Sequence, residues 1–133
     1  MKHDNSLLPL AKQVASCNAW DSMLRQVMLA GKSLLADSPA IQTDANKVVG
    51  CEAAVWMGVT KADSGKRIYS AYSPAKIVRG LLAIILEKAN ALAPAEQQTF
   101  DYQAYLAEIG LQRFLSPSRQ NGLAAVIRRI QQS

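Results

Sequence analysis

Residues 53–72 read AAVWMGVTKADSGKRIYSAY, and this stretch decides the fold. Two runs in it, Ala53–Lys61 and Arg67–Tyr72, are rich in β-branched and aromatic residues and are separated by the small and polar residues 62–65. Such runs favour strands, and a turn containing Asp, Ser and Gly favours a tight reversal between them. We therefore predict an antiparallel hairpin, and Lys47–Val49 is a candidate third strand of the same short sheet.

Helical patterns precede this hairpin. From Leu7 to Ala15 the apolar residues fall at helical spacing. A second helix is expected from an N-cap at Asn18 to a stop at Gly31. Residues 36–46 are rich in Asp, Ser, Pro and Thr, and this composition predicts a loop between the helices and the sheet.

Further helices follow the hairpin. Ser73–Pro74 offers a cap and a first-turn proline for a long helix, and Ser116–Pro117 repeats this signal for the last helix. Between them, a shorter helix is expected to begin at Ala93–Pro94, and another to run from a cap at Asp101 to Gly110. The expected buried stripe of the last helix is Leu123, Val126, Ile127 and Ile130. Because the strands form one block with helices on both sides of it in the sequence, we predict an α+β fold. In this fold a short antiparallel three-stranded sheet packs against several helices.

The composition predicts one globular domain over residues 1–133. Half of the residues are hydrophobic and 19% are charged, as in ordinary soluble proteins. The longest apolar stretch, residues 80–86, is far shorter than the ~20 residues that a membrane span needs. The net charge is +5, but the basic residues are scattered and no aromatic residues alternate with them. We therefore expect neither a membrane nor a nucleic acid as a partner.

The cysteine content favours a reducing compartment. The chain has two cysteines, which are too few for a disulfide scaffold, and its first residues do not form a secretory leader. A cytoplasmic location is therefore expected. Cys51 lies at a break of small residues between two apolar, β-prone runs, where a thiol can be presented to a partner. Cys17 falls between two predicted helices and is interpreted as a packing residue.

Several kinds of chemistry do not fit this chain. A structural zinc site needs four ligands, whereas Cys17, Cys51 and His3 are the only cysteine and histidine residues. The sequence contains no Cys-x-x-Cys pair and no phosphate-binding Gly-x-x-x-x-Gly-Lys motif. A cysteine hydrolase would need a well-placed histidine, and His3 stands at the chain terminus. What remains is thiol chemistry at Cys51 without a bound metal or cofactor.

Three blocks resemble the SufE family, the sulfur-acceptor partners of cysteine desulfurases. Val49–Glu52 (VGCE), followed by Val55-Trp56, resembles the active-site signature of that family. Ile77–Leu81 (IVRGL) resembles its Ile-Val-(Lys/Arg)-Gly-Leu helix, and Leu115–Arg119 (LSPSR) resembles its closing motif. The three blocks occur in the same order and at similar spacing, and the region of Trp20 resembles an early Trp-containing helix of the family.

The resemblance implies a SufE/IscU-like fold and a persulfide relay. A pyridoxal-phosphate-dependent cysteine desulfurase, similar to SufS or CsdA, would place sulfur on Cys51. This chain would stimulate the desulfurase and pass the sulfur to an iron–sulfur scaffold or another acceptor. Thiolate exchange needs only a nucleophile, a leaving thiolate and access. The chain would therefore need no cofactor of its own, and it would be a carrier and not itself an enzyme.

The sequence departs from the family pattern at three positions. Tyr72 and Pro74 replace two acidic residues that usually precede the Ile-Val-(Lys/Arg) helix, so the electrostatics of that loop differ from the family's. Glu52 stands where many members carry Gln, and Gly-Cys-Glu is more similar to the CsdE branch.

Four further residues are candidates for docking a partner or supporting the loop. Arg119 lies in the first turn of a predicted helix, where a cation is disfavoured, so either a bond to the Cys51 loop or a partner contact is expected. Arg79 is interpreted as a solvated flank of a buried helix, with docking as the alternative. Trp56 is expected in the core, or as a shield for the Cys51 turn. Glu52 is expected at the surface or supporting the loop, without acting as a general base.

Two other functions stay open at this stage. The chain could assemble iron–sulfur clusters itself, although IscU-type scaffolds use three cysteines and only two are present. It could also be a non-catalytic regulator that docks on a desulfurase without accepting sulfur. Retained stimulation after replacement of Cys51 by Ser would identify the regulator.

Overall fold

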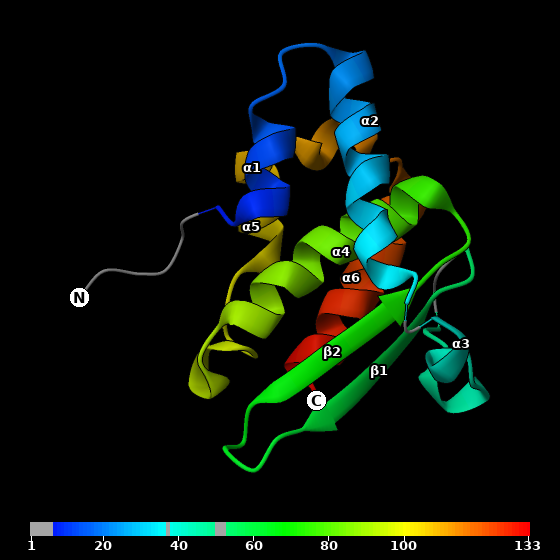
Figure 1. Cartoon of the computed structure of the whole chain (residues 1–133), viewed down its shortest axis with the longest axis vertical. Helices are drawn as coiled ribbons and strands as arrows, with labels where there is room; N and C mark the ends of the chain where they lie inside the picture. The colour runs from blue at the N-terminus through cyan, green and yellow to red at the C-terminus, as the bar shows by residue number, and fades with distance from the viewer. Residues whose placement is uncertain (1–6, 37, 50–52) are drawn as a thin grey trace.

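A computed structural model describes residues 7–36, 38–49 and 53–133. It has an α+β architecture built around one hairpin, β1 (Trp56–Lys61) and β2 (Arg67–Tyr72). In Figure 1 the hairpin crosses in front of the C-terminal helix α6 (Pro117–Gln131), and α2 (Trp20–Ala30) crosses in front of α4 (Lys76–Ala91). No helix in the described part of the chain is long and apolar enough to cross a membrane.

The predicted hairpin is confirmed, although its first strand begins at Trp56 and not at Ala53. Trp56 pairs with Tyr72 and Lys61 pairs with Arg67, in antiparallel register. The reversal closes through Ala62, whose amide donates to the Lys66 carbonyl at 2.8 Å. Gly65 has φ +89°, a backbone conformation that glycine adopts without steric cost.

The predicted third strand is wrong. Lys47 forms only an isolated bridge with Trp56, and the Val48 amide donates to the Val55 carbonyl at 2.9 Å. The sheet of the described residues therefore has two strands. The 3-10 helix η2 (Asp44–Asn46) ends directly before this segment, and Val49 already lies in a turn, so the segment pairs over too few residues to form a strand.

The hairpin has one buried face and one partly exposed face. Met57, Tyr69 and Ala71 are buried against the helices. Trp56 and Tyr72 lie on the opposite face, because successive side chains alternate along a strand. Their rings stack with centroids 6.4 Å apart.

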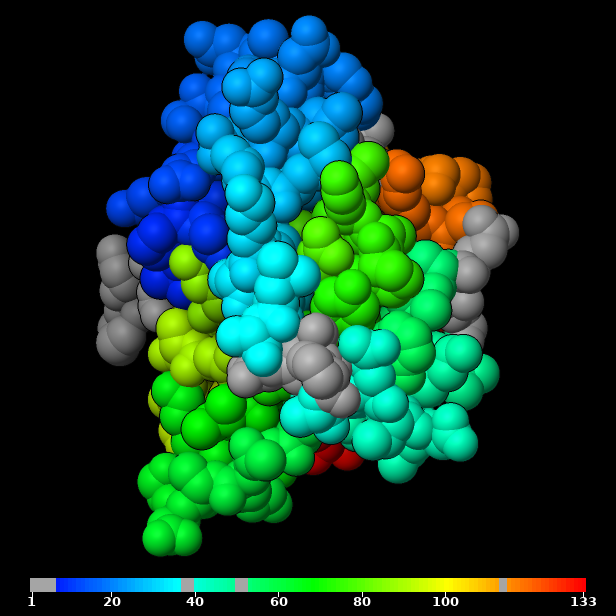
Figure 2. Space-filling view, turned by 45° about the vertical axis from the view of Figure 1, so that its right-hand side comes forward, coloured from blue at the N-terminus to red at the C-terminus, as the bar shows by residue number. Residues whose placement is uncertain are grey.

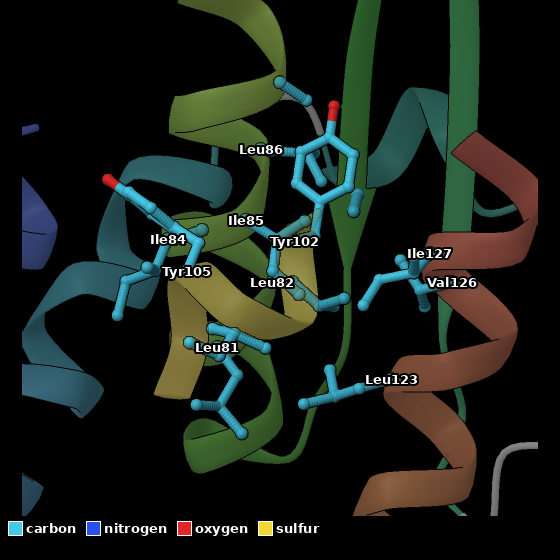
Figure 3. Packing of buried hydrophobic residues seen from close by; sticks show 14 of the residues in the cluster. Leu81, Leu82, Ile84, Ile85, Leu86, Tyr102, Tyr105, Leu123, Val126 and Ile127 are labelled. Carbon is cyan, nitrogen blue, oxygen red and sulfur yellow. The ribbon is translucent and has the colours of Figure 1, made fainter. Parts of the chain in front are cut away.

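Helix α4 is the centre of the hydrophobic core. Its residues 80–86 are all buried, so it is covered on every side. Figure 3 shows Leu123 of α6 pointing toward Leu81 and Leu82 of α4. The predicted stripe of α6 is confirmed, since Leu123, Val126, Ile127 and Ile130 are all buried.

Two side-chain amides cover the outer edge of β2. Asn90 accepts from the Tyr69 amide and donates to the Tyr69 carbonyl, at 2.8 and 3.0 Å. Gln97, which is fully buried, does the same for Arg67 at 3.0 and 2.7 Å and also donates to the Ala89 carbonyl. These amides replace the neighbouring strand that an open edge would otherwise attract.

The N-terminal region follows the prediction only in part. Helices α1 (Pro9–Ala15) and α2 are present, but the N-cap of α2 is Ala19 and not Asn18. Gly31 ends α2 with φ −64°, and the chain continues as the 3-10 helix η1 (Gly31–Leu34). The predicted loop 36–46 contains a short helix, α3 (Ser38–Ile41), and η2.

The helix starts after the hairpin differ from the prediction in two places. Ser73 does not cap α4, which begins at Lys76 with Ala75 as its N-cap; the Ser73 hydroxyl accepts from the Ala75 amide instead. Pro94 opens only a 3-10 turn, η3 (Pro94–Glu96). The cap at Asp101 is confirmed, because its carboxylate accepts from the Ala104 amide at 3.0 Å. The last elements are α5 (Tyr102–Ile109), which ends at the left-handed Gly110, then η4 (Leu111–Phe114) and α6.

Candidate functional site

The three sequence blocks meet at one pocket between the starts of α4 and α6. Its volume is about 570 Å³. The residues that line it come from α4, α6, α2 and the segment leading into β1, and most of them are apolar. They are Met28, Ala53, Val55, Ala75, Lys76, Ile77, Val78, Leu81, Leu82, Ser116, Ser118, Arg119, Gly122, Leu123 and Val126. We refer to this cavity as the α4–α6 pocket.

Helix α4 supplies one wall through its first two turns. Ile77 and Val78 are half-buried at the pocket, whereas Leu81 and Leu82 belong to the core beneath it. The first hydrogen bond of α4 runs from the Arg79 amide to the carbonyl of the N-cap residue Ala75, at 2.8 Å. In Figure 2 the start of α6, in orange, lies directly beside the start of α4, in green.

Helix α6 supplies the opposite wall. Its predicted cap is confirmed, because the Ser116 hydroxyl accepts from the Arg119 amide at 3.4 Å and Pro117 occupies the first turn. This cap fixes where the helix begins, so Ser118 and Arg119 reach the pocket from its first turn. Both side chains are half-buried there.

The segment beside Cys51 supplies the third wall. Ala53 and Val55 line the pocket, and Val55 is 2% exposed. The hydrogen bond from the Val48 amide to the Val55 carbonyl joins the two limbs of the chain that flank Cys51, residues 47–49 before it and residues 53–55 after it. Cys51 and Glu52 themselves lie outside the described residues, so their placement stays a prediction.

Trp56 and Arg79 lie together on the outer face of the hairpin and not in the pocket. The Arg79 guanidinium donates to the Ser73 carbonyl at 3.2 Å and lies 5.6 Å from the centroid of the Tyr72 ring. Tyr72 stacks on Trp56, and the Lys47 ammonium lies 5.7 Å from the centroid of the Trp56 ring. Cations over aromatic rings are attracted by the negative ring face, so this row links the start of α4 to the limb before Cys51.

Among the described residues that line the pocket, two are charged, and both are cations, Lys76 and Arg119. Two long helices also begin there, α4 with 16 residues and α6 with 15. A helix N-terminus carries partial positive charge and unpaired amides. The pocket therefore combines apolar walls with a positive rim; the positive rim stabilises a thiolate relative to a thiol, whereas the apolar walls act in the opposite direction.

Cys17 lies elsewhere. It follows α1, is half-buried, and donates its thiol hydrogen to the Gln13 carbonyl at 3.2 Å. Within the described ranges, no three His, Cys, Asp or Glu residues gather as they would around a metal ion. The hydrogen bond to Gln13 gives Cys17 a structural partner in α1.

Sequence reasoning did not identify Lys76 and Ser118 as site residues. Each occupies the first turn of a helix that a Ser-Pro pair precedes or begins. Their first-turn positions could have indicated them, because two helices that begin at one site bring their first-turn side chains together there.

Comparisons with known proteins agree with the sequence resemblance. The family model described as "SufE: Fe-S metabolism associated domain" matches residues 9–133. The sulfur acceptor protein CsdE of Escherichia coli (strain K12) is 37% identical over 117 residues, which cover 88% of this chain and 80% of that protein. An uncharacterized SufE-like protein of Haemophilus influenzae is 30% identical over 114 residues, which cover 86% and 90% of the two chains.

Proposed function

Because the chain belongs to the SufE family, we propose that it is a sulfur acceptor whose Cys51 receives persulfide sulfur from a cysteine desulfurase. One relative carries the name sulfur acceptor protein, which supports this role. The desulfurase would bring the pyridoxal phosphate, and this chain would supply the accepting thiol. We further propose that it stimulates the desulfurase and passes the sulfur on for iron–sulfur cluster assembly.

The observation that carries the proposal is the meeting of the three blocks at the α4–α6 pocket. Val55, Ile77 and Arg119 come from the three blocks and are 22 or more residues apart in the sequence, yet they line one cavity. Two of these blocks include or adjoin helix starts, and the third includes Cys51. A cavity with apolar walls and a positive rim suits an anionic sulfur species that must be kept from water and small thiols.

The proposed step is a thiol–persulfide exchange. The Cys51 thiolate attacks the outer sulfur of the persulfide on the desulfurase cysteine. A new sulfur–sulfur bond forms at Cys51, the original one breaks, and the inner sulfur leaves as the desulfurase thiolate. No external oxidant or reductant is needed, since the sulfur is transferred in the oxidation state in which it arrives.

Thiol-alkylation mass spectrometry tests this proposal. The protein is incubated with a cysteine desulfurase and cysteine, alkylated, and digested with and without reductant. We expect one additional, reductant-labile sulfur on Cys51 and none on Cys17. Persulfide confined to Cys17, or absent from both cysteines, would refute the carrier role.

The variant Cys51→Ser distinguishes the carrier from a regulator. A carrier loses its stimulation of the desulfurase when the accepting thiol is removed, because turnover depends on sulfur leaving the desulfurase. Full stimulation by Cys51→Ser would favour a non-catalytic regulator instead. An iron-bearing preparation would favour a scaffold.

A further inference from the structure

Arg129, near the end of α6, reaches back to the chain segment that precedes Cys51. Its guanidinium donates two hydrogen bonds, to the Lys47 carbonyl at 2.9 Å and to the Ala45 carbonyl at 2.7 Å. The residues are 82 and 84 positions apart in the sequence. A planar guanidinium with several donors can hold two carbonyls in one fixed geometry.

The two carbonyls belong to a segment that pairs with β1 only through the isolated bridge between Lys47 and Trp56. Ala45 is in the short 3-10 helix η2, and Lys47 is the residue that follows it. The Lys47 amide donates back to the Asp44 carbonyl at 3.2 Å, so η2 is closed on that side. Carbonyls at the end of a helix need partners from outside it, and the Arg129 side chain supplies them.

This contact lies at the base of the limb that carries Cys51. Lys47 bridges to Trp56, and the next residue, Val48, donates to Val55. Val55 in turn lines the α4–α6 pocket. Arg129 therefore restrains Lys47, the first residue of the short pairing of Lys47 and Val48 with Val55 and Trp56. The chain enters the segment of Cys51 directly after this pairing.

We propose that Arg129 is a positioning residue for sulfur transfer, acting through the backbone of residues 45–48 and not through contact with sulfur; this inference rests on the proposed function of Cys51. The same helix carries Arg119 at the pocket and Arg129 ten positions later, about 15 Å along the helix axis. Helix α6 thus ties the pocket wall and the limb before Cys51 to one rigid element. Loss of the two Arg129 bonds would free the backbone of residues 45–48, from which the chain enters the segment of Cys51.

The test compares Arg129→Ala and Arg129→Lys with the control Arg128→Ala. Arg128 is the adjacent residue, it is exposed, and its removal changes the charge of the same helix end by the same amount. Arg129→Lys keeps the charge and most of the side-chain length, so it also serves if Arg129→Ala folds poorly. A lysine has no planar fork, and we expect its effects to lie between those of Arg129→Ala and the wild type.

The first measurement is amide hydrogen exchange in the protein alone. We expect the Val48 amide to exchange ~10-fold or more faster in Arg129→Ala, because loss of charge-assisted bonds permits local opening. The Tyr69 amide, which is bonded to Asn90 in the core sheet, should keep its rate. Equal Val48 rates in Arg129→Ala and Arg128→Ala, or a parallel rise at Tyr69, would overturn the proposal.

The second measurement is sulfur transfer to Cys51 at varied concentrations of the acceptor. A positioning role lowers the maximal rate severalfold and leaves the half-saturating concentration near the wild-type value, because the defect arises after docking. A raised half-saturating concentration with an unchanged maximal rate would make Arg129 a docking residue and overturn the inference, as would unchanged transfer despite faster exchange at Val48.

The two measurements separate failure of this inference from failure of the proposed function. If wild-type Cys51 accepts no sulfur, the proposed function is refuted and the positioning role falls with it, whatever Val48 exchange shows. If the wild type accepts sulfur and the Arg129 variants behave as Arg128→Ala does, only the positioning role is refuted.

Discussion

Arg119 is the side chain at which the cap of α6, the pocket and the segment of Cys51 come together. Its amide is held by Ser116, while its side chain is half-buried at the cavity that Ala53 also lines. The cap does not depend on the guanidinium, because Ser116 and Pro117 provide the helix start by themselves. Stability and sulfur transfer can therefore be separated at this residue.

We predict that Arg119→Ala reduces sulfur transfer more than it reduces stability. Loss of a charge-assisted hydrogen bond would lower transfer or affinity by roughly tenfold to a hundredfold. Removal of a cation from the first turn of α6 should leave the helix unchanged or slightly favoured. The measurements are desulfurase stimulation and the denaturation midpoint, with Arg128→Ala as the charge-matched control. A variant that melts early but stimulates normally would give Arg119 a purely structural role.

At the level of elements, α2 and α4 cross in backbone contact. A Cβ atom built on Gly80 would lie 1.9 Å from the Val27 carbonyl oxygen, a distance that no packing adjustment of a side chain can relieve. Gly31 also approaches α4 closely, since a Cβ atom built on it would lie 3.0 Å from the Gly80 nitrogen. Glycine at position 80 therefore sets how closely the two helices approach.

Gly80→Ala is expected to destabilise the protein by about 3 kcal/mol, at the upper end of overpacking costs. The helices must separate, which also disturbs the wall of the α4–α6 pocket. Chemical denaturation measures the change. Alanine favours helix over glycine by about 1 kcal/mol, so an unchanged or higher stability would show that the crossing is not in contact.

Gln97 determines how the hairpin meets the helices. Its buried amide pairs with both backbone groups of Arg67 and with the Ala89 carbonyl, so Gln97→Leu removes hydrogen bonds from one donor and two acceptors. We expect a loss of roughly 3 kcal/mol or more, since each unpaired buried group costs about 1–3 kcal/mol. Gln103→Leu, at an exposed position of α5, is the matched control for denaturation. A loss no larger than that of the control would contradict this role.

For the molecule as a whole, Tyr102 couples stability to alkaline pH. The side chain is buried, and its hydroxyl donates to the Gln97 carbonyl at 2.5 Å. Burial, with a smaller contribution from Tyr69, raises the pKa of Tyr102 well above its usual value. The folded state therefore holds this proton more tightly than the unfolded state does.

The sign of the pH effect follows from this raised pKa. The contribution of Tyr102 is complete below the unfolded pKa of about 10 and is lost as the pH rises from there toward the folded pKa. Denaturation at pH 8 and at pH 10.5–11 should show a steeper alkaline loss for the wild type than for Tyr102→Phe, which cannot ionise. The variant should lose about 1 kcal/mol at pH 8, the usual net value of one hydrogen bond. Parallel pH profiles of the two proteins would contradict the assignment.

Features that depend on neighbouring residues could be predicted from the sequence. The turn at 62–65, the cap at Asp101 and the cap at Ser116 each rest on contacts within a few positions, so local composition predicts them. The buried stripe of α6 is likewise a matter of spacing within one helix. The three motif blocks were sufficient to indicate the family, because the order and type of their residues can be compared with a family pattern without knowledge of the structure.

How these parts are joined depends on contacts between residues far apart in the sequence. The third strand was wrong because the chain turns at Val49, directly after the pairing at Val48, and propensity alone does not show where this turn begins. The pairing of Gln97 with Arg67 spans 30 positions and that of Arg129 with Lys47 spans 82. Such contacts depend on which faces the helices bury against the sheet. For the same reason, the pocket and its positive rim exist only where the starts of α4 and α6 are packed side by side.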